Sequence, residues 1–301
     1  MSVYVCKSQL PSYFLYFFSQ TPKTRAEWLT TAHGFQNRWQ YPCCLGAVDG
    51  KHVEIVKPPN SGTLYYNYKD FFSVVLLVVA NGNYEILFVD VGSEGRLSDG
   101  GIWKKSTFFK MLRDDKLDLP PPRDLNGHDM PYHLVGDDAF ALDTHMMKPF
   151  SKKGLTPAED IFNYRLSRAR RVVENVFGIL ASRFQVLQSA IRGSVRHTNY
   201  IVLACATLHN LLRREAGRVY LGQDTVDMED VNGDINAGEW RGVGELVPMR
   251  CTTTKNPTQV AKDQRERLMA YFSTPEGEVA WQYDRHRRQL ARELSRTNKD
   301  N

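Results

Sequence analysis

Four acidic residues of this chain stand beside strongly apolar segments, where a charge is costly unless it is paired or bound to a cation. Asp49 and Asp137 each follow a short apolar run, Asp99 precedes a segment with a helical pattern, and Glu174 lies among valines. Converging carboxylates repel one another, and hard cations such as Mg²⁺ or Mn²⁺ remove that repulsion because they prefer oxygen ligands. Two such ions can activate water and stabilise the leaving oxygen in phosphodiester cleavage, which is the chemistry that this pattern would serve.

A purely structural interpretation of the same acids stays open. Asp49 could end a strand, and Asp99 could cap a helix. Glu174 could pair with Arg170, which precedes it by one helical turn.

The composition is that of a folded globular protein. Of the 301 residues, 42% are hydrophobic and 24% are charged, which excludes a wholly disordered, collagen-like or coiled-coil chain. The net charge of +5 permits a polyanionic partner without requiring one. Five cysteines without CxxC spacing indicate neither a disulfide framework nor a zinc knuckle, and they favour a reducing compartment. The apolar run at 12–18 is too short to span a bilayer, so we expect no membrane contact.

The elements that must position the acids begin with three strands. Apolar runs at 44–56, 71–80 and 84–91, with an Asn81-Gly82 turn signal, predict an antiparallel unit. A short strand at 132–135 should lie parallel to the first. We predict helices at 24–38, 101–112, 167–184, 198–214, 260–272 and 278–295, and loops at 151–166 and 218–257. This order predicts an α/β sheet with helical cover.

Several motifs in order resemble Harbinger-type transposase-derived nucleases of the DDE superfamily. They are LGAVDGKHV (45–53), PPNSG (58–62), YYNYK (65–69), DVG (90–92), SDGG (98–101), GDDAF (136–140), MKPF (147–150), FNYRLSRARRVVENVFG (162–178) and LACATLHN (203–210). The resemblance implies a ribonuclease-H-like mixed sheet, with three antiparallel strands plus parallel strands under helical cover. It implies three regions: an N-terminal helical segment at 1–40, a nuclease domain at 41–215, and a C-terminal region of loop and helices, partly disordered, at 216–301.

The resemblance also implies the site. Its acidic residues fall on Asp49, Asp99, Asp137 and Glu174 as ligands of Mg²⁺ or Mn²⁺. Asp49, Asp137 and Glu174 would be catalytic, with Asp49 bridging two ions and Asp99 as a supporting ligand. Asp138 and Asp90 are the nearest alternatives, and Asp137 is preferred to Asp138 because Gly136-Asp137 matches the Gly-Asp pair of the family.

The implied function is a divalent-metal-dependent endonuclease that hydrolyses or transfers DNA phosphodiester bonds in the nucleus. The alternative is a domesticated, non-cleaving nuclear scaffold associated with DNA or chromatin. Members of the family usually carry a long N-terminal region with a helix-turn-helix, whereas 48 residues precede Asp49 here. We therefore expect weak DNA binding by this chain alone and a separate DNA-binding partner protein. Assembly into oligomers is left open.

Basic residues near the acids are the candidates for contact with the DNA backbone. They are Arg165, Arg168, Arg170, Arg171 and Lys51. On a helix, the four arginines would form a basic stripe beside Glu174 that binds phosphates, with an ordinary solvated face as the alternative. His52 could assist a proton transfer, but we predict a hydrogen-bonded structural histidine. His209 and Asn210 are predicted to be a polar pair in the core.

Overall fold

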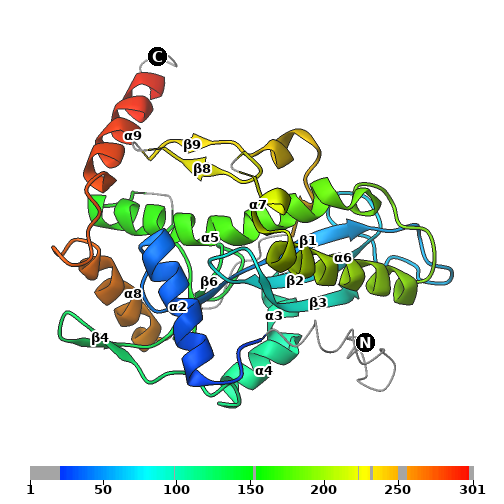
Figure 1. Cartoon of the computed structure of the whole chain (residues 1–301), viewed down its shortest axis with the longest axis horizontal. Helices are drawn as coiled ribbons and strands as arrows, with labels where there is room; N and C mark the ends of the chain where they lie inside the picture. Colours follow the sequence, from blue (N-terminus) through cyan, green and yellow to red (C-terminus); the bar gives the residue numbers. More distant parts are fainter. Residues whose placement is uncertain are drawn as a thin grey trace.

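The fold is a mixed sheet covered by helices (Figure 1). The computed structural model describes residues 21–97, 99–151, 154–222, 224–230, 233–249 and 256–297; of residues 99, 289, 290 and 292–297 it describes the backbone alone. The first part of the predicted segment 1–40 and the side chain of Asp99 therefore lie outside the described part. None of the described helices has both the length and the apolar character that crossing a bilayer requires.

The central sheet has the order β3-β2-β1-β6-β7, with β10 also paired to β1. Its strands are β1 (Cys44–Glu54), β2 (Ser73–Ala80), β3 (Ile86–Glu94), β6 (His133–Val135), β7 (Met146–Met147) and β10 (Val247–Pro248). Strands β1, β2 and β3 are antiparallel neighbours, and β6 lies parallel to β1, which confirms both predictions about strand pairing. Every residue of β2 is buried, as expected of a β-branched strand with cover on both faces.

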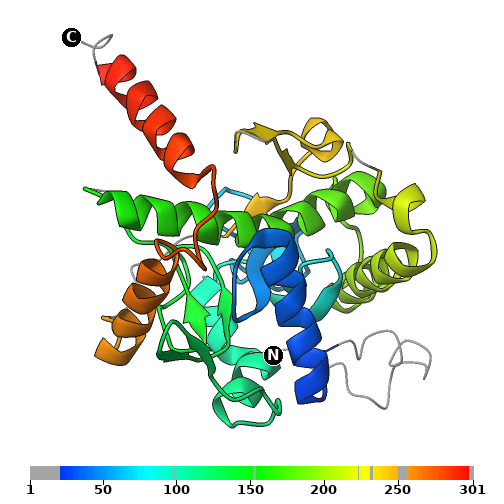
Figure 2. The same cartoon turned by 60° about the vertical axis from the view of Figure 1, so that its left-hand side comes forward.

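The helices lie on the sheet and at its ends. They are α2 (Arg25–Trp39), α3 (Asp99–Lys105), α4 (Thr107–Arg113), α5 (Pro157–Arg183), α6 (Val195–Glu215), α7 (Gly217–Tyr220), α8 (Gln259–Tyr271) and α9 (Gln282–Thr297). Helices α2 and α5 pack on β1, and α6 packs on β3. Figure 2 shows that α9 projects from the body of the molecule.

Helix α5 begins ten residues earlier than its apolar periodicity predicts, so the predicted loop at 151–166 is wrong from Pro157 onward. Thr156 and Glu159 form a capping box: the Thr156 hydroxyl accepts from the Glu159 amide, and the Glu159 carboxylate accepts from the Thr156 amide at 2.8 Å. Pro157 at the first helical position supports this start. The capping box and Pro157 can both be read from the sequence, and they determine where the helix starts although its first turns lack a clear apolar face.

Two further predictions are corrected. The expected helix at 101–112 is split, because the Ser106 hydroxyl accepts from the Phe109 amide and so caps a new helix, α4. The expected loop at 218–257 contains the hairpin of β8 (Met228–Glu229) and β9 (Ile235–Asn236), the 3₁₀ turn η2 (Glu239–Gly242) and β10. A second hairpin joins β4 (Arg123–Leu125) to β5 (His128–Met130), and a 3₁₀ turn η1 (Gln185–Leu187) follows α5.

Candidate active site

Strand pairing brings the first two acids together. Ala47 of β1 pairs with Val135 at the end of β6. Asp49 follows Ala47 by two residues, and Asp137 follows Val135 by two residues. Since the strands are parallel, Asp49 and Asp137 reach the same level of the sheet. Burial, and secondly the charge of Asp49, raise the pKa of the Asp137 carboxyl. Its neighbour Asp138 is exposed to solvent.

Backbone amides partly satisfy both carboxylates. Asp49 is 2% exposed, and its Oδ1 accepts from the Gly50 amide at 2.8 Å. Asp137 Oδ1 accepts from the Ala139 amide at 2.9 Å. Among the described residues, no well-aligned hydrogen bond reaches Asp49 Oδ2, although a lysine ammonium lies close to it.

Helix α5 supplies the third acid. It packs on β1, and its Glu174 side chain is partly exposed. Arg170, one turn earlier, places its Nη2 2.6 Å from Glu174 Oε1. Burial by itself lowers the pKa of Arg170, but Glu174, Asp49 and Asp137 outweigh it and raise that pKa above its ordinary value. One guanidinium therefore interacts with all three carboxylates.

Lys51 is the second base of the site. Its Nζ lies 2.9 Å from Asp49 Oδ2 and 5.8 Å from the centre of the Phe177 ring on α5. Burial by itself lowers the pKa of Lys51, but Asp49 and then Glu174 raise it above its ordinary value. We refer to Asp49, Asp137, Glu174, Lys51 and Arg170 as the charge cluster.

The charge cluster suits a hard divalent ion in the chemistry of its donors, which are carboxylates from three separate elements. The buried Asp49 Oδ2, which Lys51 contacts, has the lone pairs that a metal would use. Within the described part of the chain, however, no three His, Cys, Asp or Glu residues stand close enough to share an ion. The predicted fourth ligand, Asp99, begins α3, and its side chain is outside the described residues. In this conformation the carboxylates surround Lys51 and Arg170, so a metal ion would have to displace these two side chains.

The alternative acid Asp90 lies on β3, where it pairs with Leu77 of β2, and both β2 and β1 lie between it and β6. Burial raises its pKa to about 6, and Lys110 opposes that shift. Asp90 therefore lies on an outer strand of the described sheet, apart from Asp49 and Asp137.

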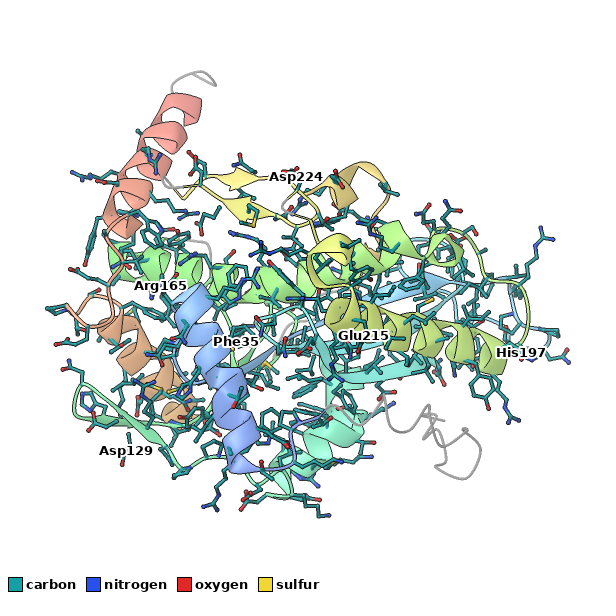
Figure 3. All side chains as sticks on the ribbon, in the orientation of Figure 1. Phe35, Asp129, Arg165, His197, Glu215 and Asp224 are labelled. Carbon is teal, nitrogen blue, oxygen red and sulfur yellow. The ribbon has the colours of Figure 1, made fainter. Side chains whose placement is uncertain are left out.

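The predicted basic stripe is wrong for three of its four arginines. Arg165, Arg168 and Arg171 are at most 7% exposed. Arg165, labelled in Figure 3, donates to the Gly277 carbonyl and to Gln282 Oε1 at 2.9 Å each, and stacks over Phe272. These arginines are buried against the C-terminal segments of the chain and, for Arg165 and Arg168, against the end of α2 at Gln40, so the predicted solvent-facing stripe does not form in this structure.

A buried carboxylate that sequence analysis missed explains the other two arginines. Glu229 of β8 accepts from Arg168 Nε, and its second oxygen accepts from the Tyr164 hydroxyl at 2.5 Å. Arg171 Nη1 lies 3.9 Å from the same carboxylate. Glu229 stands in a segment predicted to be a loop, and no local pattern marked it.

The segment from 224 to 249, described except for 231 and 232, forms a strap over α5. Trp240 Nε1 donates to Asn175 Oδ1 at 3.0 Å, and Asn175 is the residue that follows Glu174 in α5. The Trp240 ring lies against Gly178, where an added Cβ would stand 2.1 Å from ring carbon Cδ2. Further along, β10 pairs with β1 at Lys51 and at His52. The strap therefore touches β1 and α5, two of the three elements that carry the charge cluster.

The histidines are structural, as predicted. His52 is buried, and its Nδ1 lies 2.8 Å from Ser73 Oγ. Burial, and secondly Lys51, lower the pKa of His52 to about 4, so it is neutral at pH 7. His209 Nε2 contacts the Tyr84 carbonyl at 2.7 Å, and Asn210 pairs with both backbone groups of Ile86, which joins α6 to the edge strand β3.

Comparison with known proteins places these features in a family. The family described as "DDE superfamily endonuclease" matches residues 48–210, just over half of the chain. A human protein named "Putative nuclease HARBI1" is 29% identical over 191 residues, covering 62% of this chain and 51% of its own length. Its Bos taurus counterpart is 30% identical over 173 residues, or 56% of this chain and 46% of its own length. "Protein ALP1-like" of Arabidopsis thaliana is 26% identical over 202 residues, which cover 63% of this chain and 44% of its own length.

The chain thus spans about half the length of the curated relatives that it matches. No solved structure matches it significantly. The matched residues include Asp49, Asp137 and Glu174, while the strap follows them in sequence. The chain belongs to the DDE superfamily endonucleases, and within them to the Harbinger-type, transposase-derived nucleases.

Proposed function

We propose that this protein is a divalent-metal-dependent endonuclease of transposase origin that acts on DNA in the nucleus, on a ribonuclease-H-like fold. The observation that carries the proposal is the arrangement of Asp49, Asp137 and Glu174. They come from β1, from the loop directly after β6 and from α5, and each interacts with the same two bases. Family membership and the nuclease names of the relatives support it.

The chain's own residues would divide the work by position. Asp49, the most buried of the three acids, would hold both ions, and Asp137, just after the adjacent strand β6, would complete one site. Glu174, partly exposed on α5, would complete the other site and orient the attacking water or 3′-hydroxyl. Asp99 would support them. The ions, Mg²⁺ or Mn²⁺, would supply Lewis acidity and neutralise charge that develops on the phosphate.

A plasmid-nicking assay in Mn²⁺ and in Mg²⁺ tests the proposal. Wild-type protein should nick supercoiled DNA, and chelation should stop it. Asp49→Asn, Asp137→Asn and Glu174→Gln should each lose activity by at least about 100-fold, the scale seen when one charge-stabilising group is lost. Asp138→Asn is the matched control, because it removes an exposed carboxylate beside Asp137 and should stay active. Equal loss in the control, or full activity in the three variants, would refute the assignment.

A non-cleaving scaffold that associates with DNA or chromatin is the second candidate. The observation that favours it is the charge pairing: Lys51 and Arg170 already neutralise the acids in the described conformation. A scaffold of this kind would bind DNA equally with and without Mg²⁺, and Mg²⁺ would leave its melting temperature unchanged. Those two results, together with absent nicking, would select it over the nuclease.

A further inference from the structure

Two internal bases occupy the space between the three carboxylates. The Lys51 ammonium is paired with Asp49 and interacts with Glu174 and Asp137. Arg170 is paired with Glu174 and interacts with the other two acids. Three negative and two positive charges thus share one site, and its surplus negative charge is small without any metal.

Of the two bases, Lys51 is the more closely confined. Its side chain is 16% exposed, its backbone is held between β2 and β10, and its ammonium meets the Phe177 ring. The pair with Asp49 satisfies a charge that would otherwise be buried alone, which is strongly unfavourable. Lys51 therefore supplies the positive charge that pairs with the buried Asp49 in the metal-free protein.

A divalent ion bound to Asp49 would weaken the ion pair between Asp49 and Lys51. It would compete for the oxygen, Oδ2, that Lys51 contacts, and it would repel the ammonium. A lysine has a flexible four-carbon stem, so its charge can move while its backbone stays in the strand. Released from Asp49 at the candidate active site, the ammonium needs a new anion, and a DNA phosphate is the anion that a nuclease would bring there.

We propose that Lys51 is an exchange residue, which pairs with Asp49 in the metal-free protein and with a DNA phosphate once metal binds. The inference rests on the proposed function and adds a coupling to it: metal binding and DNA binding favour one another through one side chain. By thermodynamic linkage, Mg²⁺ must raise DNA affinity by the same factor by which DNA raises Mg²⁺ affinity.

Fluorescence anisotropy and calorimetry on the full chain test this coupling. The duplex carries phosphorothioate linkages that resist cleavage, and a gel confirms that it is intact. For wild type, Mg²⁺ should raise DNA affinity by about 10-fold, within the usual range of coupling. When Mg²⁺ is absent, Lys51→Gln and wild type should bind DNA with equal affinity. Adding Mg²⁺ should raise the DNA affinity of Lys51→Gln only slightly. In the absence of DNA, Lys51→Gln should bind Mg²⁺ more tightly than wild type does.

Two further variants separate exchange from simpler roles. Lys69→Gln removes an exposed lysine that is not part of the charge cluster and whose Nζ lies over the Tyr68 ring. It should keep the full Mg²⁺ effect on DNA affinity and unchanged Mg²⁺ affinity. Lys51→Arg keeps the charge and should retain most of the coupling, which keeps the test valid if Lys51→Gln folds poorly.

The outcomes are distinct. If Lys51→Gln weakens DNA binding equally with and without Mg²⁺, Lys51 is a constant phosphate contact and the exchange is refuted. An unchanged Mg²⁺ effect in Lys51→Gln also refutes it, while the nuclease proposal stands. If wild type binds no Mg²⁺ at all, the proposed function and the exchange fail together.

Discussion

Asp49 lies two residues beyond Ala47 in β1, and Asp137 lies two residues beyond Val135, the residue that pairs with Ala47 and ends the parallel strand β6. This relationship follows from the register of β1 and β6, and it makes the two carboxylates electrostatic neighbours. Their repulsion without metal has a cost in stability that depends on pH, on metal and on substitution.

Replacing Asp137 should stabilise the metal-free protein. Burial and Asp49 raise the pKa of Asp137, so the folded state holds this proton more tightly than the unfolded chain does. The destabilisation is absent below the ordinary Asp pKa of about 3.9 and grows as pH rises through the raised value. Asp137→Asn should therefore melt about 2 °C above wild type at pH 7 in chelator. Melting curves from pH 3.5 to 8 should converge at the acidic end, and Asp138→Asn should follow wild type throughout.

Mg²⁺ or Mn²⁺ should raise the melting temperature of wild type through mass action. At a free ion concentration 100 times the dissociation constant, the gain is about 2.7 kcal/mol for one site. Asp49→Asn should lose most of this gain, because it removes the most buried carboxylate of the charge cluster. Differential scanning fluorimetry across a metal titration measures both proteins, and Asp138→Asn again serves as control. A response of Asp49→Asn that matches wild type would show that the stabilising ion binds elsewhere.

Arg168→Ala should unfold the protein more easily rather than weaken DNA binding. The substitution leaves Glu229 as a buried carboxylate that has lost its closest ion pair, which costs about 3 kcal/mol. Urea denaturation measures the loss, and adding Glu229→Gln should recover part of it. Arg287→Ala removes an arginine of 76% exposure from the pair with Asp284 and should change stability by less than about 0.5 kcal/mol. A smaller loss at Arg168 than at Arg287 would contradict the buried network.

The contact between Trp240 and Gly178 should show strong non-additivity. Trp240→Ala empties the site over α5 and leaves Asn175 Oδ1 with one fewer donor, at a cost of about 3–5 kcal/mol. Gly178→Ala places a methyl group where the Trp240 ring lies, so it should displace the ring from α5 and also lower the stability. Once Trp240 is absent, the methyl group meets no ring, so the double variant should be no less stable than Trp240→Ala. Additive losses in urea denaturation would mean that Gly178 does not act through Trp240.

Much of the fold follows from local pattern in the sequence. The apolar runs around Asn81-Gly82 predict three antiparallel strands, which the structure confirms with β3 starting two residues late, at Ile86. Tyr84 takes a left-handed φ of 66° within the turn, which extends it beyond two residues. The strand before Asp137 is predicted beside β1 from motif order, and it lies there. These features depend on neighbours in sequence or on a short, strongly apolar strand that fits only a sheet interior.

The sequence by itself also determined which acids to consider, because Asp49, Asp137 and Glu174 stand in recognisable motifs on predicted elements. Only the tertiary structure decided what surrounds them. The pattern of α5 shows arginines on one face, but a helical pattern does not say whether solvent, DNA or another segment covers that face. Glu229, which pairs with Arg168, lies 61 residues further along the chain, and Gln282, which binds Arg165, lies 117 residues further. Such pairs form because burying a guanidinium requires an acceptor with exact geometry, and that requirement is met by folding, not by any spacing in the sequence.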